Sequence, residues 1–411
     1  MRKKSLSKNF VFFLPIFIII VAITNDYFGE SFLNMGAIRA IILLPFCLFF
    51  LTKNFNKTNF NIIILIFLCY MGILSAFTSN PDYTLYVFAK MFIASMMLPI
   101  GFYYIKTLDD LKKLTRNYFI SIIIIIIMFG FSNYYSVGKE SYKDSTVLFG
   151  ESGVNITKSL ALLLMTIPLF LYNNKSKRLL YFVLFVTITS LIVVTLGLKR
   201  TAIISLAVGY LIYFIFKENK SKSTQYAILI FIILIVSSPL YYDYLETRIF
   251  AREKNLNYES TDDMLEEWRY KETEIGLKVI SDGNIITKLF GEELFNSFNY
   301  LDIPYMFHND YITVLAGSGF VGLFFLLWIY LSIIVYFKKT YKVIKNNYSI
   351  SKELRAVVFS IITFLIIISI GGSIHGIEIR ALAFLYIGGV LGFSKQLMLE
   401  VLNENSIYRR Y

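Results

Sequence analysis

The chain has 411 residues, of which 56% are hydrophobic and 17% charged, and its formal net charge is +12. A mean hydropathy of +0.62, together with repeated apolar runs, excludes an ordinary soluble domain. The positive charge does not indicate nucleic-acid binding, because the basic residues lie in loops too short to build a binding domain. Cys47 and Cys69 fall inside apolar runs, where they are most simply small core residues that say nothing about redox compartment.

The apolar runs predict one all-α, polytopic integral membrane domain over residues 1–411. The first run follows Arg2-Lys3-Lys4 and has no small-residue cleavage site, so we expect a retained helix and not a removed signal peptide. In chain order, about twelve transmembrane helices are predicted, at 10–24, 36–52, 61–78, 84–105, 117–132, 157–173, 179–197, 201–216, 225–241, 311–337, 356–374 and 381–394.

The loops between these spans differ in charge according to side. The two termini and the even-numbered loops carry most of the 40 Lys and Arg residues and few of the 28 Asp and Glu residues. The positive-inside rule places that side in the cytoplasm. Both termini are therefore predicted to be cytoplasmic, and the large loop 242–310, between helices 9 and 10, to be extracytoplasmic.

Two outer loops are long enough to fold, about 132–156 and about 242–310. The second contains a predicted amphipathic helix. Ser260–Asp263 supplies a cap and acidic first-turn residues, and Asp282-Gly283 supplies the stop. Between these ends, four apolar residues lie on roughly one stripe and suit a helix lying over the membrane mouth: Leu265, Trp268, Ile275 and Val279.

Several basic residues are not explained by the positive-inside rule. Lys199 and Arg200 stand in a very short outer turn, and Arg380 follows His375–Glu378 at the last outer connection. Arg39, Lys90 and Lys158 lie in the outer halves of predicted spans. Some of these side chains would snorkel to the interface, but charge inside a membrane usually faces a cavity, a partner or a ligand. Together they predict a cationic chamber suited to a phosphate or diphosphate.

His308 opens a polar stretch, His308–Thr313, that leads directly into a long apolar run. Histidine has the unperturbed pKa closest to neutrality, so this position is a candidate for proton transfer or anion binding. The alternative is an interfacial residue that tolerates both media. The sequence shows no HExxH, paired-Cys, Asp-x-Asp or Walker A pattern. We therefore expect no metal and no cofactor, and energy from an activated substrate or an ion gradient.

Three elements of the sequence resemble the O-antigen ligase and O-antigen polymerase (Wzy-type) superfamily of bacterial surface-polysaccharide assembly. Arg200-Thr201 opens a span after a short turn, and Arg269 lies in the loop sequence Arg269–Ile280, before Leu289-Phe290-Gly291. His308-Asn309 comes last, followed by Gly317 and Gly319. In the family the loop arginine usually stands four residues before a tryptophan, but Thr273 occupies that place here, so Arg248 or Arg252 is an alternative to Arg269.

The resemblance implies metal-independent glycosyl transfer at the outer face of the plasma membrane. The donor would be an oligosaccharide on undecaprenyl diphosphate, and the acceptor a sugar hydroxyl. Arg200 and Arg269 would neutralise the departing diphosphate, and His308 would orient the acceptor hydroxyl or take its proton. These three are the predicted catalytic residues.

The predicted substrate-binding residues form two groups. Lys199, Arg39, Lys90 and Arg380 would belong to the diphosphate chamber. Asn309, Asp310 and Tyr311 would hydrogen-bond sugar hydroxyls, with a simple interfacial polar role as an equal alternative. Close approach of helices is the preferred interpretation of Gly317, Gly319 and Gly322.

The substrate and partners expected are the lipid-linked oligosaccharide and the lipid bilayer, and no nucleic acid. Within the family, polymerisation of repeat units is favoured over ligation to a lipid or other acceptor. This preference rests only on the size of the family and on the divergent loop sequence. A flippase or secondary transporter is a rival interpretation, but it should show internal repeats and charge near the midplane, and a scaffold role is a further one. Whether a chain-length regulator binds is left open.

Overall fold

The computed structural model describes residues 2–24, 35–140, 147–149, 153–197, 199–217, 268–296, 307–374 and 376–408. Its elements are helices: α1 (Arg2–Thr24), α2 (Met35–Lys53), α3 (Asn59–Ser75), α4 (Pro81–Tyr104), α5 (Leu108–Tyr135), α6 (Gly153–Leu164), α7 (Ile167–Phe170), α8 (Lys177–Leu196), α9 (Arg200–Phe216), α14 (Trp268–Asp282), α15 (Ile285–Phe290), α16 (Asp310–Ile344), α17 (Ile350–Ile368), η3 (Ser369–Gly371) and α18 (Ile377–Tyr408).

The all-α, polytopic class predicted from the sequence is confirmed. Within the described ranges, the only β-structure is an isolated bridge between Glu140 and Leu148. Seven of the described helices are long and apolar enough to cross a membrane, and α3, α6 and α9 are shorter apolar helices. Every predicted span except the ninth, 225–241, falls on a described helix, the span 36–52 on α2, whereas the ninth lies outside the described residues. The total of twelve spans stays a prediction.

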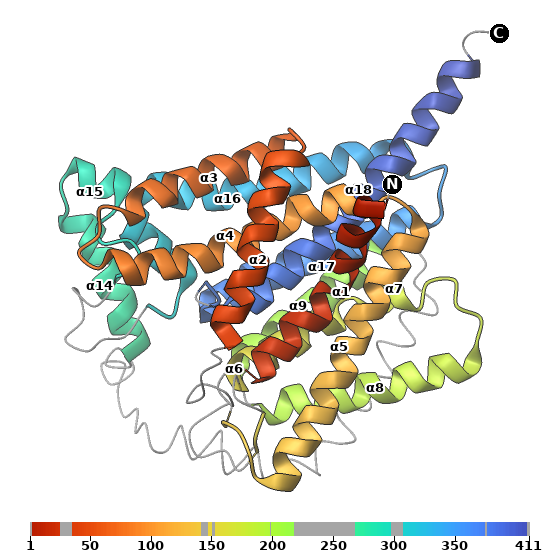
Figure 1. Ribbon diagram of the computed structural model, residues 1–411, viewed down its shortest axis with the longest axis horizontal. Coiled ribbons are helices and arrows are strands. Elements are labelled where there is room, and N and C mark those ends of the chain that lie inside the picture. Colours follow the sequence, from red (N-terminus) through yellow and green to blue (C-terminus); the bar gives the residue numbers. More distant parts are fainter. Residues whose placement is uncertain are drawn as a thin grey trace.

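α4 and α18 pack together at the centre of the bundle (Figure 1), and the apolar stretch of α18 is buried throughout. Glycines allow the two backbones to touch. A Cβ added at Gly101 would lie 2.3 Å from the carbonyl oxygen of Leu385, and one added at Gly388 would lie 2.2 Å from that of Leu98. Small residues are the usual means of close helix approach in membranes, where no hydrophobic force drives helices together.

One predicted span is divided in the structure. The run 157–173 forms α6 and α7, with a turn at Met165-Thr166 between them. Pro168 lies in the first turn of α7. A proline has no N–H, and its ring clashes with the carbonyl four residues earlier, which here is that of Leu164, the last residue of α6. The division therefore follows from a residue that hydropathy alone does not register.

α16 is interrupted at Gly319, within the glycine-rich part of its first turns. Gly319 has φ 64° and ψ −168°, a conformation that is essentially restricted to glycine. The freed carbonyls have partners elsewhere: Ala316 O accepts the backbone N–H of Glu292 at 2.8 Å, and Ser318 O accepts the Tyr70 hydroxyl at 2.6 Å. Gly291, at φ 76°, lies so close that an added Cβ would be 2.3 Å from Ser318 N. These contacts join α15 and the following turn to α16.

The loop helix predicted before Asp282-Gly283 is α14, and its end at Asp282 is confirmed. Its predicted cap at Ser260–Asp263, and Leu265 with it, lie outside the described residues. Ile275 and Val279 pack against a small buried cluster of Phe307, Ile312 and Ala316. α14 therefore lies against the start of α16, and Figure 1 shows α14 and α15 together at one edge of the bundle.

Candidate active site

Several of the residues predicted to be functional, or their chain neighbours, contact one segment, Ser369–Ile374, which comprises η3 and the three residues after it. Lys158 of α6 is buried, and its Nζ donates to the carbonyl oxygens of Gly371, at 3.1 Å, and of Gly372. A lysine at the end of a helix suits the negative end of the helix dipole. A Cβ at Gly371 would lie 2.5 Å from the Thr201 methyl group, so the first turn of α9 also contacts the segment.

His308 reaches the same segment one residue further on. Gly372 has φ 76°, and a Cβ there would lie 2.0 Å from the His308 carbonyl oxygen. Only glycine fits this place, because both the backbone conformation and the space exclude a side chain. Arg200-Thr201 and His308 are more than a hundred residues apart in sequence. They are thus brought to one end of the bundle by contacts with two consecutive glycines.

Asp310 and Arg380 lock the start of α16 to this segment. Their side chains are 0% and 4% exposed, and Arg380 Nη2 lies 2.8 Å from Asp310 Oδ2. Asp310 also accepts the backbone N–H groups of Ser373, at 2.7 Å, and Ile374, at 2.8 Å, and the Ser373 hydroxyl at 2.7 Å. A buried carboxylate needs this many donors, because burial of an unpaired charge is costly.

Arg39 is likewise buried in an ion pair, with Glu378 of α18. The predicted chamber cations therefore fall into two groups. Arg39, Arg380 and Lys158 contact carboxylates or carbonyls of the protein itself. Arg200 is exposed, and Lys199 is half-buried at the N-cap of α9. Substrate binding by Arg39 and Arg380 stays a prediction.

Two predicted basic residues lie differently. Lys90, in α4, is half-buried with its Nζ 4.0 Å from the centre of the Tyr86 ring, a cation–π contact. The backbone of Arg269 lies in the first turn of α14, but its side chain is outside what the structure describes, as are Arg248, Arg252 and His375. The role of each of these stays a prediction.

Asn309 and Tyr311 have local structural contacts. Asn309 is the N-cap of α16, and its side-chain oxygen accepts the backbone N–H of Tyr311 at 2.9 Å and, more weakly, that of Ile312 at 3.4 Å. The Tyr311 hydroxyl donates to the Ile366 carbonyl oxygen at 2.8 Å. These contacts fit the interfacial polar alternative. Sugar binding by either residue stays a prediction.

His308 is paired with a carboxylate that the sequence analysis did not single out. Glu272 of α14 accepts the His308 backbone N–H through Oε2 at 3.0 Å. His308 Nδ1 lies 2.8 Å from Glu272 Oε1 and 2.9 Å from Oε2. The Glu272 side chain is 3% exposed, whereas that of His308 is 53% exposed. The buried carboxylate of Glu272 thus contacts Nδ1 of His308, while the imidazole ring is half exposed.

The close packing of α14 against α16 brings Glu272 next to His308. A Cβ at Gly276, one turn after Glu272, would lie 2.3 Å from the Ile312 side chain, so α14 approaches α16 closely at this level. Glu272 also occupies a position on the apolar stripe of α14, at helical spacing between Trp268 and Ile275. A charged residue in the middle of an apolar stripe is the signal from which sequence analysis could have found Glu272.

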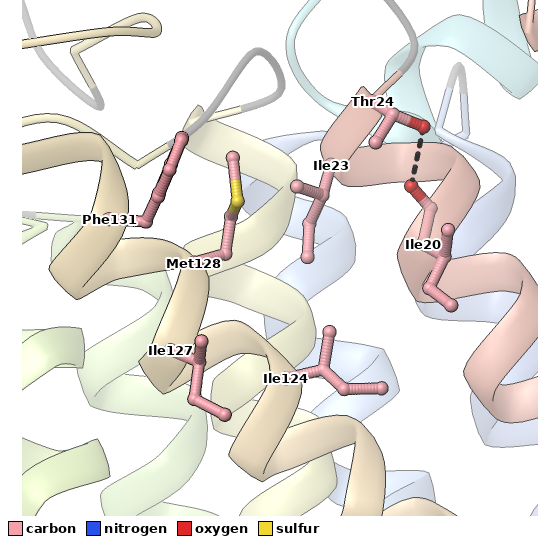
Figure 2. Close-up of a pocket in the computed structure, with 7 residues that line it drawn as sticks. All are labelled: Ile20, Ile23, Thr24, Ile124, Ile127, Met128 and Phe131. Atoms are coloured by element: carbon pink, nitrogen blue, oxygen red, sulfur yellow. Dashed lines mark hydrogen bonds between the residues drawn. The ribbon is translucent and has the colours of Figure 1, made fainter. Parts of the chain in front are cut away.

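Among the described residues, neither a metal site nor a cavity adds a residue to the candidate site. In the part of the chain that the structure describes, no three His, Cys, Asp or Glu side chains gather where they could hold a metal ion. A groove of about 340 Å³ lies between α1 and α5 (Figure 2). It is apolar apart from Thr24, whose hydroxyl donates to the Ile20 carbonyl oxygen. The other lining residues are Ile20, Ile23, Ile124, Ile127, Met128 and Phe131.

Residues 185–327 match a family model described as O-Antigen ligase. This region, about a third of the chain, is similar to the O-antigen ligase family. The matched region runs from α8 into α16 and contains Arg200, Glu272, His308 and the helix break at Gly319. The resemblance drawn from the sequence is therefore confirmed at the level of the superfamily. No curated protein shows significant sequence similarity to the chain.

The family and the helices together support a multi-pass membrane protein with a function of the O-antigen ligase or polymerase type. The family also points to a membrane enzyme acting on polysaccharide. Of the predicted site residues, His308, Asp310 and Arg380 lie around Ser369–Ile374, as does Thr201 next to Arg200.

Proposed function

We propose that this protein polymerises undecaprenyl-diphosphate-linked oligosaccharide repeat units, of an O-antigen or a capsular polysaccharide, at the outer face of the plasma membrane. The O-antigen ligase match supports the reaction class. The single observation that carries the proposal is the location of Glu272-bound His308 and of Arg200-Thr201 against the consecutive glycines Gly371 and Gly372. A proton acceptor and a diphosphate-binding cation are the two groups that glycosyl transfer from a lipid diphosphate requires.

In the proposed reaction, the acceptor hydroxyl oxygen attacks the anomeric carbon of the donor saccharide. The bond from that carbon to the diphosphate oxygen breaks, and the electron pair leaves with undecaprenyl diphosphate. His308 takes the proton of the hydroxyl, as a general base does. Arg200 neutralises charge that develops on the diphosphate, and its forked donors suit phosphate oxygens. The donor already carries the free energy of the reaction, so neither metal nor cofactor has a step.

The test is transfer by the purified protein, reconstituted in lipid vesicles with a donor that carries one repeat unit on undecaprenyl diphosphate. A ladder of longer lipid-linked saccharides is expected. A second reaction adds a lipid-core acceptor: transfer to that acceptor in place of a ladder would identify a ligase. Movement of the donor across the vesicle membrane with no new glycosidic bond would overturn the enzyme proposal in favour of a transporter.

We also propose that both termini are cytoplasmic and that residues 242–310 are extracytoplasmic, because the inner loops are basic. An impermeant thiol reagent on intact cells should label Asn255→Cys and leave Asn346→Cys unlabelled. Asn346 is exposed in the turn between α16 and α17, so absence of label there would report side and not burial. The opposite labelling pattern would reverse the topology.

A further inference from the structure

We propose that Glu272 is a positioning residue for the transfer reaction. It holds His308 in the tautomer that carries its hydrogen on Nδ1, and so presents Nε2 as the proton acceptor. The role in transfer rests on the proposed function. The tautomer of His308, by contrast, is a property of the protein that can be measured without any substrate.

The arrangement of donors around Glu272 leads to this tautomer. The His308 backbone N–H can only donate, and it lies 3.0 Å from Oε2. A carboxylate offers only acceptors, so the ring nitrogen 2.8 Å from Oε1 must be a donor. Nδ1 therefore carries hydrogen, and the lone pair of the neutral ring is on Nε2. The backbone bond and the ring bond together fix the imidazole at two points.

Because Glu272 is buried, its carboxylate requires hydrogen-bond donors from the protein, and His308 provides them. The Glu272 side chain is 3% exposed, and the apolar residues of the same stripe, Ile275 and Val279, are partly buried. A carboxylate at such a place is unfavourable unless charge-assisted hydrogen bonds compensate for its loss of water. His308 supplies two of them. Its half-exposed ring is oriented by the protein at Nδ1, while Nε2 is on the side away from Glu272, where an acceptor hydroxyl can reach it.

Replacing Glu272 by glutamine should reverse the tautomer. The glutamine side chain has one acceptor oxygen and one NH2 group. If the oxygen takes the place of Oε2 and accepts the His308 backbone N–H, the NH2 group takes the place of Oε1, the nearer of the two to Nδ1 (2.8 Å against 2.9 Å), and favours the ring with hydrogen on Nε2. If the amide is flipped, its NH2 group opposes the backbone N–H and two donors clash. The favourable orientation therefore leaves an Nε2–H that cannot accept a proton.

The kinetic test compares Glu272→Gln with Glu274→Gln in the reconstituted transfer assay. Glu274 is in the same helix, its side chain is 60% exposed, and it forms a surface pair with Lys278 at 2.7 Å, so it is a matched control. Glu272→Gln is expected to lower kcat about 10² to 10⁴-fold, as for loss of a general base, with little change in KM for the acceptor. Glu274→Gln should keep wild-type kcat. Equal effects of the two substitutions would overturn the proposal.

The tautomer is read from ¹⁵N NMR of histidine-labelled protein in detergent. The chain has two histidines, so His375→Asn leaves His308 as the single labelled ring. Hydrogen on Nδ1 is expected in this background, and hydrogen on Nε2 once Glu272→Gln is added. An Nε2–H ring in the His375→Asn protein, or a tautomer unaffected by Glu272→Gln, would overturn the assignment even if Glu272→Gln lowered the yield of folded protein.

The two measurements separate the inference from the proposed function. If the wild-type protein transfers no sugar but shows the expected tautomers, the proposed function fails and Glu272 still orients the ring. If transfer occurs and the tautomers are not as expected, the proposed function stands and the assignment of Glu272 fails. Glu272→Asp, which keeps both acceptor oxygens on a shorter side chain, should retain the Nδ1–H tautomer and recover part of kcat.

Discussion

The two ends of the α9–α17 helix pair carry polar clusters of different kinds. At one end, α9 begins at Arg200-Thr201 against Gly371, next to the segment that contacts His308. At the other end, buried Glu353 of α17 accepts the Tyr213 hydroxyl and pairs with Lys217 of α9, whose Nζ is 3.3 Å away. Arg355 donates to the Phe216 carbonyl oxygen at 2.8 Å and lies over the Tyr341 ring.

The difference lies in where the charged groups point. In the Glu353 cluster, a carboxylate, a phenol and an ammonium satisfy one another between two helices, as Lys217 Nζ also lies 2.7 Å from the Tyr213 hydroxyl oxygen. At the Arg200 end, Asp310 pairs with Arg380 and Arg39 pairs with Glu378, and all four side chains are buried, whereas Arg200 and His308 are exposed. The two ends therefore differ in that only the Arg200 end combines buried ion pairs with exposed residues of the predicted site.

The largest expected effect is that of His308→Ala. Loss of a general base typically lowers the rate about 10² to 10⁴-fold, so polymer should disappear while lipid-linked repeat units accumulate at the outer face. Gel analysis of extracted polysaccharide and of labelled lipid-linked saccharides measures both. His375→Ala is the control and should retain nearly normal polymer. Mild and equal losses from the two substitutions would make His308 an interfacial residue.

Arg200→Ala should come next, with a loss of about 10² to 10³-fold in kcat, the usual effect of removing one electrostatic donor to a developing charge. Arg200→Lys should restore transfer only in part, because a point charge cannot reproduce bidentate geometry. Lys217→Ala, at the opposite end of the same helix, is the matched control and should leave transfer unchanged. Near-normal polymer from Arg200→Ala, with wild-type protein levels in the membrane, would remove Arg200 from the mechanism.

Arg380→Ala should act mainly on stability. It leaves Asp310 buried without its counter-ion, which typically costs about 3–5 kcal/mol, and thermal unfolding in detergent would register the loss. The double substitution Asp310→Asn with Arg380→Met removes both charges and should recover most of the stability. If the double variant recovers stability and transfer, Arg380 is a structural residue. If it recovers stability alone, Arg380 binds the diphosphate as the sequence suggested.

Glu353→Gln should have the smallest effect. The amide oxygen can still accept the Tyr213 hydroxyl, and Lys217, with its side chain 25% exposed, can be hydrated. We expect a loss of about 1.5–3 kcal/mol in unfolding free energy, as for a hydrogen bond to a charged group, and unchanged kcat. A strong loss of transfer at wild-type stability would show that the two ends are coupled and would contradict the distinction drawn between them.

Much of the fold follows from the sequence by itself. The apolar runs determine where helices lie, because a chain crossing a bilayer must satisfy its backbone hydrogen bonds within each segment. Features set by neighbouring residues also follow from the sequence. These are the end of α14 at Asp282, the start of α16 after His308-Asn309, and the need for glycine around Gly319. Pro168, by contrast, divides one apolar run into two helices, and hydropathy does not detect it.

The candidate site was only half accessible from the sequence. Arg200 and His308 could be proposed from the sequence because each is a polar residue next to an apolar run, a contrast between neighbours in the chain. Glu272 was missed, although its place on an apolar stripe was visible, because it lies 36 residues before His308 in the chain. The sequence also did not show which basic residues are available to a ligand and which form ion pairs within the protein. Arg39, for example, pairs with Glu378, which is 339 residues away in the chain.

The sequence by itself determined the class of the protein, the approximate spans and the approximate starts of α9 and α16. The tertiary structure alone decided that Thr201 and His308 contact neighbouring glycines, that Asp310 and Arg380 neutralise each other, and that the Glu272 carboxylate meets the imidazole of His308. The physical reason is that hydropathy and capping act between residues within a few turns. Charge pairing and close backbone approach depend on which helices meet, and many helix arrangements share the same apolar pattern.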